Sequence, residues 1–228
     1  MSNNPSVSVV AIDGPSASGK STVSKRVAQE LKFTYVDSGS LYRGMTWKAL
    51  REGVEIARPD QVVDLMNRMQ FEFYAENCIV LFTIDGEDPG LQIRSEPVRE
   101  NVADIAAIPE VRAFLVARLQ EMVRFGDIVM EGRDIGTVVF PETPFKYYLD
   151  ADPEERARRR SLELKSMEGV GDVHKVLDSL KRRDKKDSTR KTAPLQIALG
   201  ARVINSTSMS IEEVVAQIVA EVRAARGA

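Results

Sequence analysis

The sequence contains very little of two residue types on which many enzyme sites depend. Among its 228 residues there is one cysteine, Cys78, and one histidine, His174. A single cysteine excludes disulfides within the chain and multi-cysteine zinc sites, and it favours a reducing compartment. A single histidine excludes most hydrolase triads and histidine-rich metal sites, because these use imidazole as a base or a ligand. His174 lies in a polar helical stretch, and we interpret it as a solvated side chain.

A strong excess of one charge and long hydrophobic runs are also missing. The 32 basic and 34 acidic residues leave a formal net charge of −2, which does not suggest a general binder of nucleic acid polymers. No apolar run approaches the roughly 18 to 20 residues that cross a bilayer. Residues 1–5 have no basic region before an apolar segment, so they do not resemble a secretory signal. We therefore expect a cytoplasmic protein whose partners are neither nucleic acid polymers nor membranes. We also expect a monomer.

The most specific motif lies near the start of the chain. Residues 14–21 follow G-x-x-x-x-G-K-S, between an apolar run at residues 7–12 and a helical pattern. This context separates a phosphate-binding loop from its alternative, a glycine-rich turn without a ligand. Lys20 would reach the β- and γ-phosphates of a nucleotide, and the Ser21 hydroxyl would hold Mg²⁺. The residues of the loop predicted to bind ATP are Gly14, Pro15, Ser16, Ala17, Ser18, Gly19, Lys20, Ser21 and Thr22.

Strands and helices alternate along most of the chain, which predicts a parallel sheet with helices on both faces. The five strands are expected at residues 7–12, 33–36, 127–130, 145–149 and 202–204. Turn-separated β-type segments at residues 71–74 and 78–84 predict a small antiparallel unit outside that core. The fold class is therefore α/β, a three-layer phosphate-loop fold with a five-stranded parallel sheet, an antiparallel insertion and a short helical lid.

The chain divides into a core and an inserted region. We assign residues 1–37 and 126–228 to the core, with the lid at about residues 152–190. The first lid helix is expected to start at D-P-E-E, residues 152–155, because this string combines a capping residue, a proline and a carboxylate. Residues 38–125 form the inserted region, with the antiparallel unit at about residues 70–93.

Three charged clusters lie where ligands bind in such sheets, beyond the carboxyl ends of the strands. They are D-S-G-S-L-Y-R at residues 37–43, E-G-R-D-I-G-T at 131–137 and R-D-K-K-D-S-T-R at 183–190. Arginine suits phosphate handling, because its planar guanidinium pairs with phosphate oxygens and keeps its proton. These clusters are the candidates for the site of the second substrate.

Taken together, the motifs resemble those of the bacterial type of cytidylate kinase, a family of phosphate-loop nucleoside monophosphate kinases. The resemblance covers nearly the whole chain. It depends on the phosphate loop, S-G-x-x-Y-R at residues 38–43, the stretch from I-R at 93–94 through V-R at 111–112, G-R-D-I-G-T-V-V-F-P at 132–141 and the cluster at 183–190. It implies that residues 38–125 bind the monophosphate. It also implies that ATP, with Mg²⁺, donates its γ-phosphoryl group to CMP or dCMP.

The resemblance implies a role for each matching residue. Arg43, Arg133 and Arg190 would hold the acceptor phosphate, and Arg112 and Asp134 would face the cytosine. A carboxylate accepts from the exocyclic amine of cytosine and repels the carbonyl oxygen of uracil. The full CMP set is Ser38, Arg43, Arg112, Arg133, Asp134, Arg183, Asp187 and Arg190. The catalytic set is Lys20, Arg133, Asp134, Arg183 and Arg190. The metal would be held by Ser21, with Glu131 acting through water.

The chemistry of the acceptor agrees with this assignment. A monophosphate is largely a dianion near neutral pH, so it needs no protein base, and the lack of a catalytic histidine is no difficulty. Catalysis would consist of in-line positioning and charge neutralisation. Two residues depart from the pattern of the family: Glu131 stands where aspartate is common, and Ala103 stands where members carry a serine that contacts the base. The methyl group of Ala103 removes about one hydrogen bond, roughly 0.5 to 1.5 kcal/mol of base selection.

Several alternatives remain open at this point. Arg43 could pair with a carboxylate on its own helix, and Arg112 could be a surface residue. The arginines of residues 156–160 fit either a solvated helix face or a lid that brings Arg159 to the ATP phosphates. Two other functions also compete. A GTP-dependent switch would need D-x-x-G and N-K-x-D elements, which are missing. Another small-molecule or nucleotide kinase on the same fold, such as one for shikimate, fits poorly with the antiparallel insertion and the G-R-D run.

Overall fold

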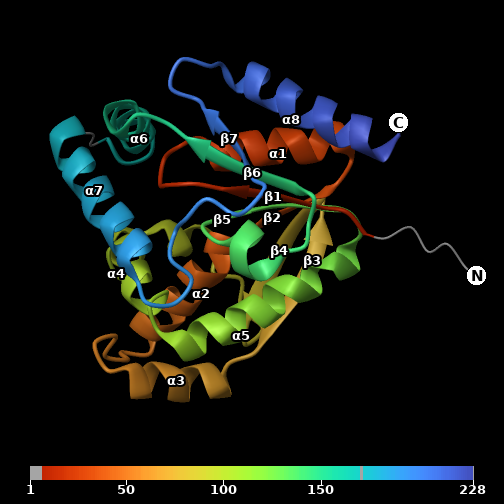
Figure 1. The fold of residues 1–228 in the computed structure, drawn as a ribbon. Helices are drawn as coiled ribbons and strands as arrows, with labels where there is room; N and C mark the ends of the chain where they lie inside the picture. Colours follow the sequence, from red (N-terminus) through yellow and green to blue (C-terminus); the bar gives the residue numbers. More distant parts are fainter. Residues whose placement is uncertain (1–6, 170–171, 228) are drawn as a thin grey trace, which may run out of the picture.

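A seven-stranded sheet runs through the middle of the computed structural model, which describes residues 7–169 and 172–227 (Figure 1). Its strand order is β3-β4-β2-β5-β1-β6-β7. The strands are β1 (Val9–Asp13), β2 (Thr34–Asp37), β3 (Phe71–Glu76), β4 (Ile79–Ile84), β5 (Ile128–Gly132), β6 (Phe145–Asp150) and β7 (Arg202–Asn205). The helices are α1 (Lys20–Leu31), α2 (Ser38–Arg51), α3 (Pro59–Arg68), α4 (Glu96–Ile105), α5 (Pro109–Gln120), α6 (Pro153–Glu168), α7 (Val173–Thr189) and α8 (Ile211–Arg226).

Both faces of the sheet are covered, which explains why β1 is apolar without alternation. Val10 and Ile12 pack into one hydrophobic cluster with residues of α1 and α8. Val9 and Ala11 point to the opposite face, into a larger cluster with residues of α2, α3, α4 and α5. Figure 1 shows α1 and α8 side by side above the sheet, with α2 and α5 below it. The predicted three-layer α/β architecture is confirmed.

The antiparallel hairpin extends the main sheet, which corrects the prediction that it lies outside the core. Strands β2, β5, β1, β6 and β7 form the expected five parallel strands. Strand β4 then pairs in parallel with β2, where the Tyr35 N–H donates to Cys78 O at 2.8 Å, and β3 pairs antiparallel with β4. The hairpin covers backbone groups that would otherwise be exposed along the edge of β2. The buried side chains Val80, Phe82 and Ile84 also join the larger cluster.

Helices α6 and α7 pack against each other at the end of the sheet where β6 ends (Figure 1). Asp152 caps α6 by accepting from the Glu154 N–H at 2.9 Å, as the D-P-E-E string predicts. Ala157, Val176 and Leu180 form a small cluster between the two helices, with Ala17 of the phosphate loop against it. The two helices predicted to form the lid therefore lie directly beside the loop. No helix in the described part of the chain is long and apolar enough to span a membrane.

Candidate functional site

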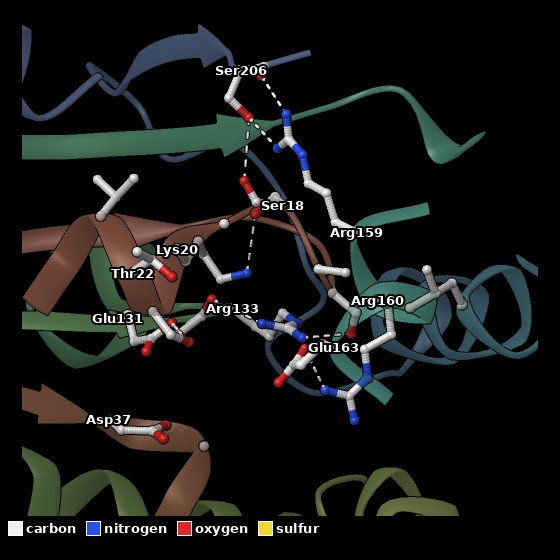
Figure 2. A pocket seen from close by; sticks show the side chains of 18 of the residues that line it. Ser18, Lys20, Thr22, Asp37, Glu131, Arg133, Arg159, Arg160, Glu163 and Ser206 are labelled. Atoms are coloured by element: carbon white, nitrogen blue, oxygen red, sulfur yellow. Dashed lines mark hydrogen bonds and ion pairs between the residues drawn. The ribbon is translucent and has the colours of Figure 1, made fainter. Parts of the chain in front are cut away.

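A cavity of about 1480 Å³ opens along the carboxyl ends of the parallel strands. A pocket for one small molecule usually encloses about 300 to 1,000 Å³. This cavity is larger than that, so it has room for two small molecules. Every site residue predicted from the sequence lines it except Gly14 and Pro15, which belong to the loop behind it. Figure 2 shows Lys20, Glu131 and Arg133 pointing into the same space, with Arg159 reaching to Ser206 above them. The folding of the chain thus brings the predicted site residues together.

The phosphate loop requires glycine at its first position. Gly14 has a φ of 148°, and a Cβ there would lie 2.1 Å from the Leu149 carbonyl oxygen of β6. Beyond the loop, Lys20 turns back so that its Nζ donates to Pro15 O at 2.5 Å and to Ser18 Oγ at 3.3 Å. Burial lowers the pKa of Lys20 to about 7, and Arg133 adds to the effect. A phosphate ligand would supply the anion that stabilises this buried ammonium group.

Ser21 and Glu131 form the candidate metal site. Ser21 Oγ donates to Glu131 Oε2 at 3.0 Å, and burial raises the pKa of the Glu131 carboxyl. Among the described residues, no three His, Cys, Asp or Glu side chains gather into a complete metal site. Mg²⁺ commonly uses only one or two protein oxygens and completes its octahedron with substrate phosphates and water. A hydroxyl beside a carboxylate at the end of the phosphate loop fits that ion.

Arg112 is a buried residue of α5, so the alternative that it is a surface residue is wrong. Only 2% of its surface is exposed, and it donates to the Asp134 carboxylate and to Ala106 O. Arg190 approaches the other oxygen of Asp134 at 4.0 Å. Four buried polar atoms in this part of the cavity have no hydrogen-bond partner among the described residues: Tyr42 Oη, Arg43 Nε, Arg112 Nε and Arg190 Nη2. Such orphaned donors are rare in folded proteins, and their gathering indicates a polar ligand.

Arg133 connects the two halves of the cavity. Its Nη2 donates to Ser16 Oγ of the phosphate loop at 2.8 Å, and its Nε donates to Asp187 Oδ2 of α7 at 3.0 Å. Burial opposes ionisation of Asp187, but Arg133 and Arg183 lower its pKa below the usual value. Burial and Arg133 lower the pKa of Arg183 to about 10, so it remains a cation at neutral pH. The junction therefore concentrates positive charge where two phosphates would meet.

Ser38 and Arg43 begin α2 beside this junction. Arg43 Nη2 donates to Asp37 Oδ2 at 2.6 Å, and the same carboxylate caps the helix by accepting from the Ser40 N–H at 3.1 Å. Arg43 therefore pairs with a carboxylate, but with the last residue of β2 and not with one on its own helix, and its Nε has no hydrogen-bond partner among the described residues. Ser38 Oγ donates to Glu131 O at 2.6 Å, which ties α2 to the end of β5.

The arginines of residues 156–160 divide between the two roles that the sequence left open. Arg156 is buried, and its Nη1 donates to Ser16 O at 3.0 Å and to Asp184 Oδ2 at 2.6 Å. Arg158 is exposed and pairs with Glu155 of its own helix. Arg159 lines the cavity, where its Nη2 donates to Ser206 O at 2.8 Å. Arg160 also lines the cavity and pairs with Glu163 at 2.7 Å. Arg158 is therefore the most solvated of the four although it too borders the cavity, while Arg156 fastens α6 to the phosphate loop.

The sequence interpretation missed several residues at the site. Ser206 follows β7, and its Oγ donates to Ser18 O at 3.2 Å, so the loop after this strand braces the phosphate loop. Asp13, the last residue of β1, accepts from the N–H groups of Ile135 and Gly136 at 2.8 and 2.7 Å. Both stand at carboxyl ends of parallel strands, a position that would have identified them. The position of Asp184 near Ser16 has no comparable signal in the sequence.

Asp13 supplies a test by pH. Burial raises its pKa to about 6 from a usual value of 3.8. Because the folded state binds this proton more tightly, the group contributes stability below about pH 4 that is lost as the pH rises through about 6. The free energy of unfolding of the wild type, relative to Asp13→Asn, should therefore decrease by up to about 3 kcal/mol between pH 4 and pH 7. Urea titrations of both proteins at several pH values measure this difference, and a constant difference would contradict it.

Comparison with known proteins agrees with the geometry. A family model described as cytidylate kinase matches residues 10–224. The chain is similar to a cytidylate kinase of Caldanaerobacter subterraneus subsp. tengcongensis, with 41% identity over 94% of each chain. It is also similar to one of Pelotomaculum thermopropionicum, with 42% identity over 95% of this chain and 96% of the relative. For one of Geobacillus kaustophilus the identity is 42%, over 92% of this chain and 93% of the relative. The chain therefore belongs to the cytidylate kinase family.

Proposed function

We propose that this protein transfers the γ-phosphoryl group of ATP to CMP and dCMP, with release of ADP and CDP or dCDP. The observation that carries the proposal is the contact of Arg133 with both Ser16 of the phosphate loop and Asp187 beside the acceptor half. A bridging cation at that point would lie between a donor and an acceptor phosphate. Family membership supports the identity of the nucleotides.

The donor half would bind the triphosphate through the phosphate loop. Its backbone N–H groups surround an anion at the start of α1, and the buried Lys20 ammonium would pair with the β- and γ-phosphates. Mg²⁺ would be held by Ser21, with Glu131 next to it, and when bound it neutralises charge on the phosphate oxygens. Arg159 and the loop at Ser206 lie on the wall of this half, where they would complete the ATP site.

The acceptor half would hold a monophosphate among fixed cations. Arg43, Arg133 and Arg190 would bind its phosphate, with Arg183 adding charge and Asp187 accepting from the sugar hydroxyls. The acceptor phosphate is itself the nucleophile, since it is largely a dianion at neutral pH. The protein therefore contributes position and charge neutralisation, and it moves no proton.

Selection of the base would depend on Asp134 and Arg112. The Asp134 carboxylate can accept from the exocyclic amine of cytosine, and the hydrogen bond from Arg112 holds that carboxylate in place. Ala103 lines the same cavity with a methyl group that offers no hydrogen bond. We therefore expect discrimination against UMP to come from Asp134, with no contribution from residue 103.

The same proposal extends to the division of the chain. Residues 38–125 would form the acceptor-binding region, and residues of about 152–190 would form a lid over the phosphates. Supporting this, Lys186 of α7 pairs with Asp104 of α4 at 2.8 Å, so an ion pair between two exposed side chains joins the two regions. A solvent-exposed pair of this kind contributes at most about 1 kcal/mol, so it could break during closure.

Release of ADP tests the proposal most directly. Purified protein with Mg²⁺ and ATP should release ADP when CMP or dCMP is added, and far more slowly with UMP, AMP or shikimate. The competing functions give different outcomes, because a guanine-nucleotide switch would retain GTP and ignore these acceptors. Fast release of ADP with shikimate, or none with CMP and dCMP, would contradict the proposal.

A further inference from the structure

Tyr35 is a buried tyrosine of β2 that the proposed mechanism does not use. Only 3% of its surface is exposed, and its ring packs into the cluster between the sheet and helices α1 and α8. The Lys25 ammonium lies 5.5 Å from the centre of the ring. The phenolic hydroxyl donates to Glu131 Oε1. Burial and the charge of Glu131 raise the pKa of Tyr35, so this hydroxyl keeps its proton and remains a donor.

The two oxygens of the Glu131 carboxylate have separate partners. Oε1 accepts from Tyr35, and Oε2 accepts from Ser21 Oγ at 3.0 Å. In the register of the sheet, Glu131 of β5 stands opposite Asp37 of β2, two residues beyond Tyr35, so the three side chains share one face. Asp37 repels the Glu131 carboxylate and raises its pKa further. The hydrogen bond from the tyrosine hydroxyl therefore fixes one oxygen of this carboxylate while the other faces Ser21.

This arrangement controls the direction in which the Ser21 hydroxyl group points its hydrogen atom. A hydroxyl that binds a cation must offer an oxygen lone pair and point its hydrogen elsewhere. Glu131 Oε2 takes that hydrogen, which leaves the Ser21 lone pairs available for a cation. An unsupported glutamate has several rotatable bonds, and fixing it costs conformational entropy that the bond from Tyr35 offsets.

We propose that Tyr35 is a positioning residue for the metal of the donor nucleotide, acting through Glu131 on the orientation of Ser21. This inference depends on the proposed ATP site but not on the identity of the acceptor. Side chains that hydrogen-bond to metal ligands keep those ligands oriented. Their removal commonly weakens metal affinity about 10- to 100-fold. Tyr35 is a neutral donor that makes one hydrogen bond to the carboxylate. Its loss should therefore reduce metal affinity by an amount near the lower end of that range.

The test compares Tyr35→Phe with the wild type in two binding measurements without any acceptor. Electron spin resonance measures the Kd of Mn²⁺ for the protein with ATP, and calorimetry in EDTA measures the Kd of metal-free ATP. We expect Mn²⁺ to bind about 10-fold more weakly to the variant, while metal-free ATP binds as it does to the wild type. An unchanged Kd for Mn²⁺, or equal losses in both measurements, would overturn the proposal, because a merely structural role weakens both.

Two further variants make the comparison sharper. Tyr147→Phe removes a hydroxyl from another buried tyrosine of the same cluster, on β6, and should leave both Kd values unchanged. In a Glu131→Gln background, Tyr35→Phe should cause a clearly smaller further loss of Mn²⁺ affinity, because the two side chains act together. Fully additive losses would contradict the inference. A protein that shows the Tyr35 effect on Mn²⁺ but does not phosphorylate CMP would refute the proposed function and leave this inference intact.

Discussion

Replacement of Lys20 by alanine is expected to lower the turnover number for CMP phosphorylation by about 10²- to 10³-fold or more. Lys20 is a buried ammonium of the phosphate loop, held by Pro15 O and Ser18 Oγ. An ammonium group in a buried position interacts more strongly with phosphate charge than one in water, so its loss should weaken stabilisation of the transferred γ-phosphoryl group. Steady-state ADP release with saturating CMP measures the loss.

The location of Lys20 in the donor half predicts a specific pattern. CMP should bind to Lys20→Ala nearly as it binds to the wild type, because the residues proposed to bind the acceptor lie in α2 and α5, in and just after α7, and just after β5. Calorimetry that showed lost CMP binding would contradict this separation of the two halves. Lys32→Ala is a suitable control, because Lys32 is an exposed residue at the other end of the same helix.

Replacement of Asp134 by alanine should cause the second large effect, a loss of about 10²- to 10³-fold in kcat/KM for CMP. Asp134 accepts from Arg112 in a pair that is buried on both sides. Removing the carboxylate takes away the acceptor for the amine of cytosine, and it also leaves the Arg112 cation buried without its partner. Initial rates over a range of CMP concentrations separate kcat from KM.

Measurements on the other substrate distinguish this effect from a general loss of structure. The Kd of ATP for Asp134→Ala should equal that of the wild type, and unchanged CMP kinetics would refute the assignment. Asp134→Asn gives a finer test, because an amide can donate to the carbonyl oxygen of uracil as well as accept. The ratio of CMP to UMP activity should therefore fall in this variant. Asp64→Ala, at an exposed position of α3, is the matched control.

The parts of the site that the sequence predicts well are local. The phosphate loop is a contiguous string whose requirements concern its own backbone, such as the positive φ of Gly14 and Gly19. The end of each parallel strand is also readable, because the apolar run stops there and polar residues follow. Arg133 and Asp134 come directly after β5 and could be assigned from that position.

Contacts between residues that lie far apart in the sequence could not be predicted from local sequence patterns. The arginines of residues 156–160 are chemically alike, yet Arg156 is buried against Ser16 while Arg158 is exposed. Only the crossing of α6 over the phosphate loop distinguishes them. Likewise, Arg112 and Asp134 are 22 residues apart, and their contact depends on how α5 packs under the sheet.

By itself, the sequence determined the nucleotide-binding loop, the α/β class and the family, because these depend on local backbone geometry and on strings of adjacent residues. The tertiary structure alone decided that the hairpin joins the sheet through β4 and that Tyr35 meets Glu131. Both contacts depend on which strands lie next to each other in the sheet. The order of the strands is determined by the burial of apolar surface across the whole fold. The partners of a charged or polar side chain are therefore set by distant parts of the chain.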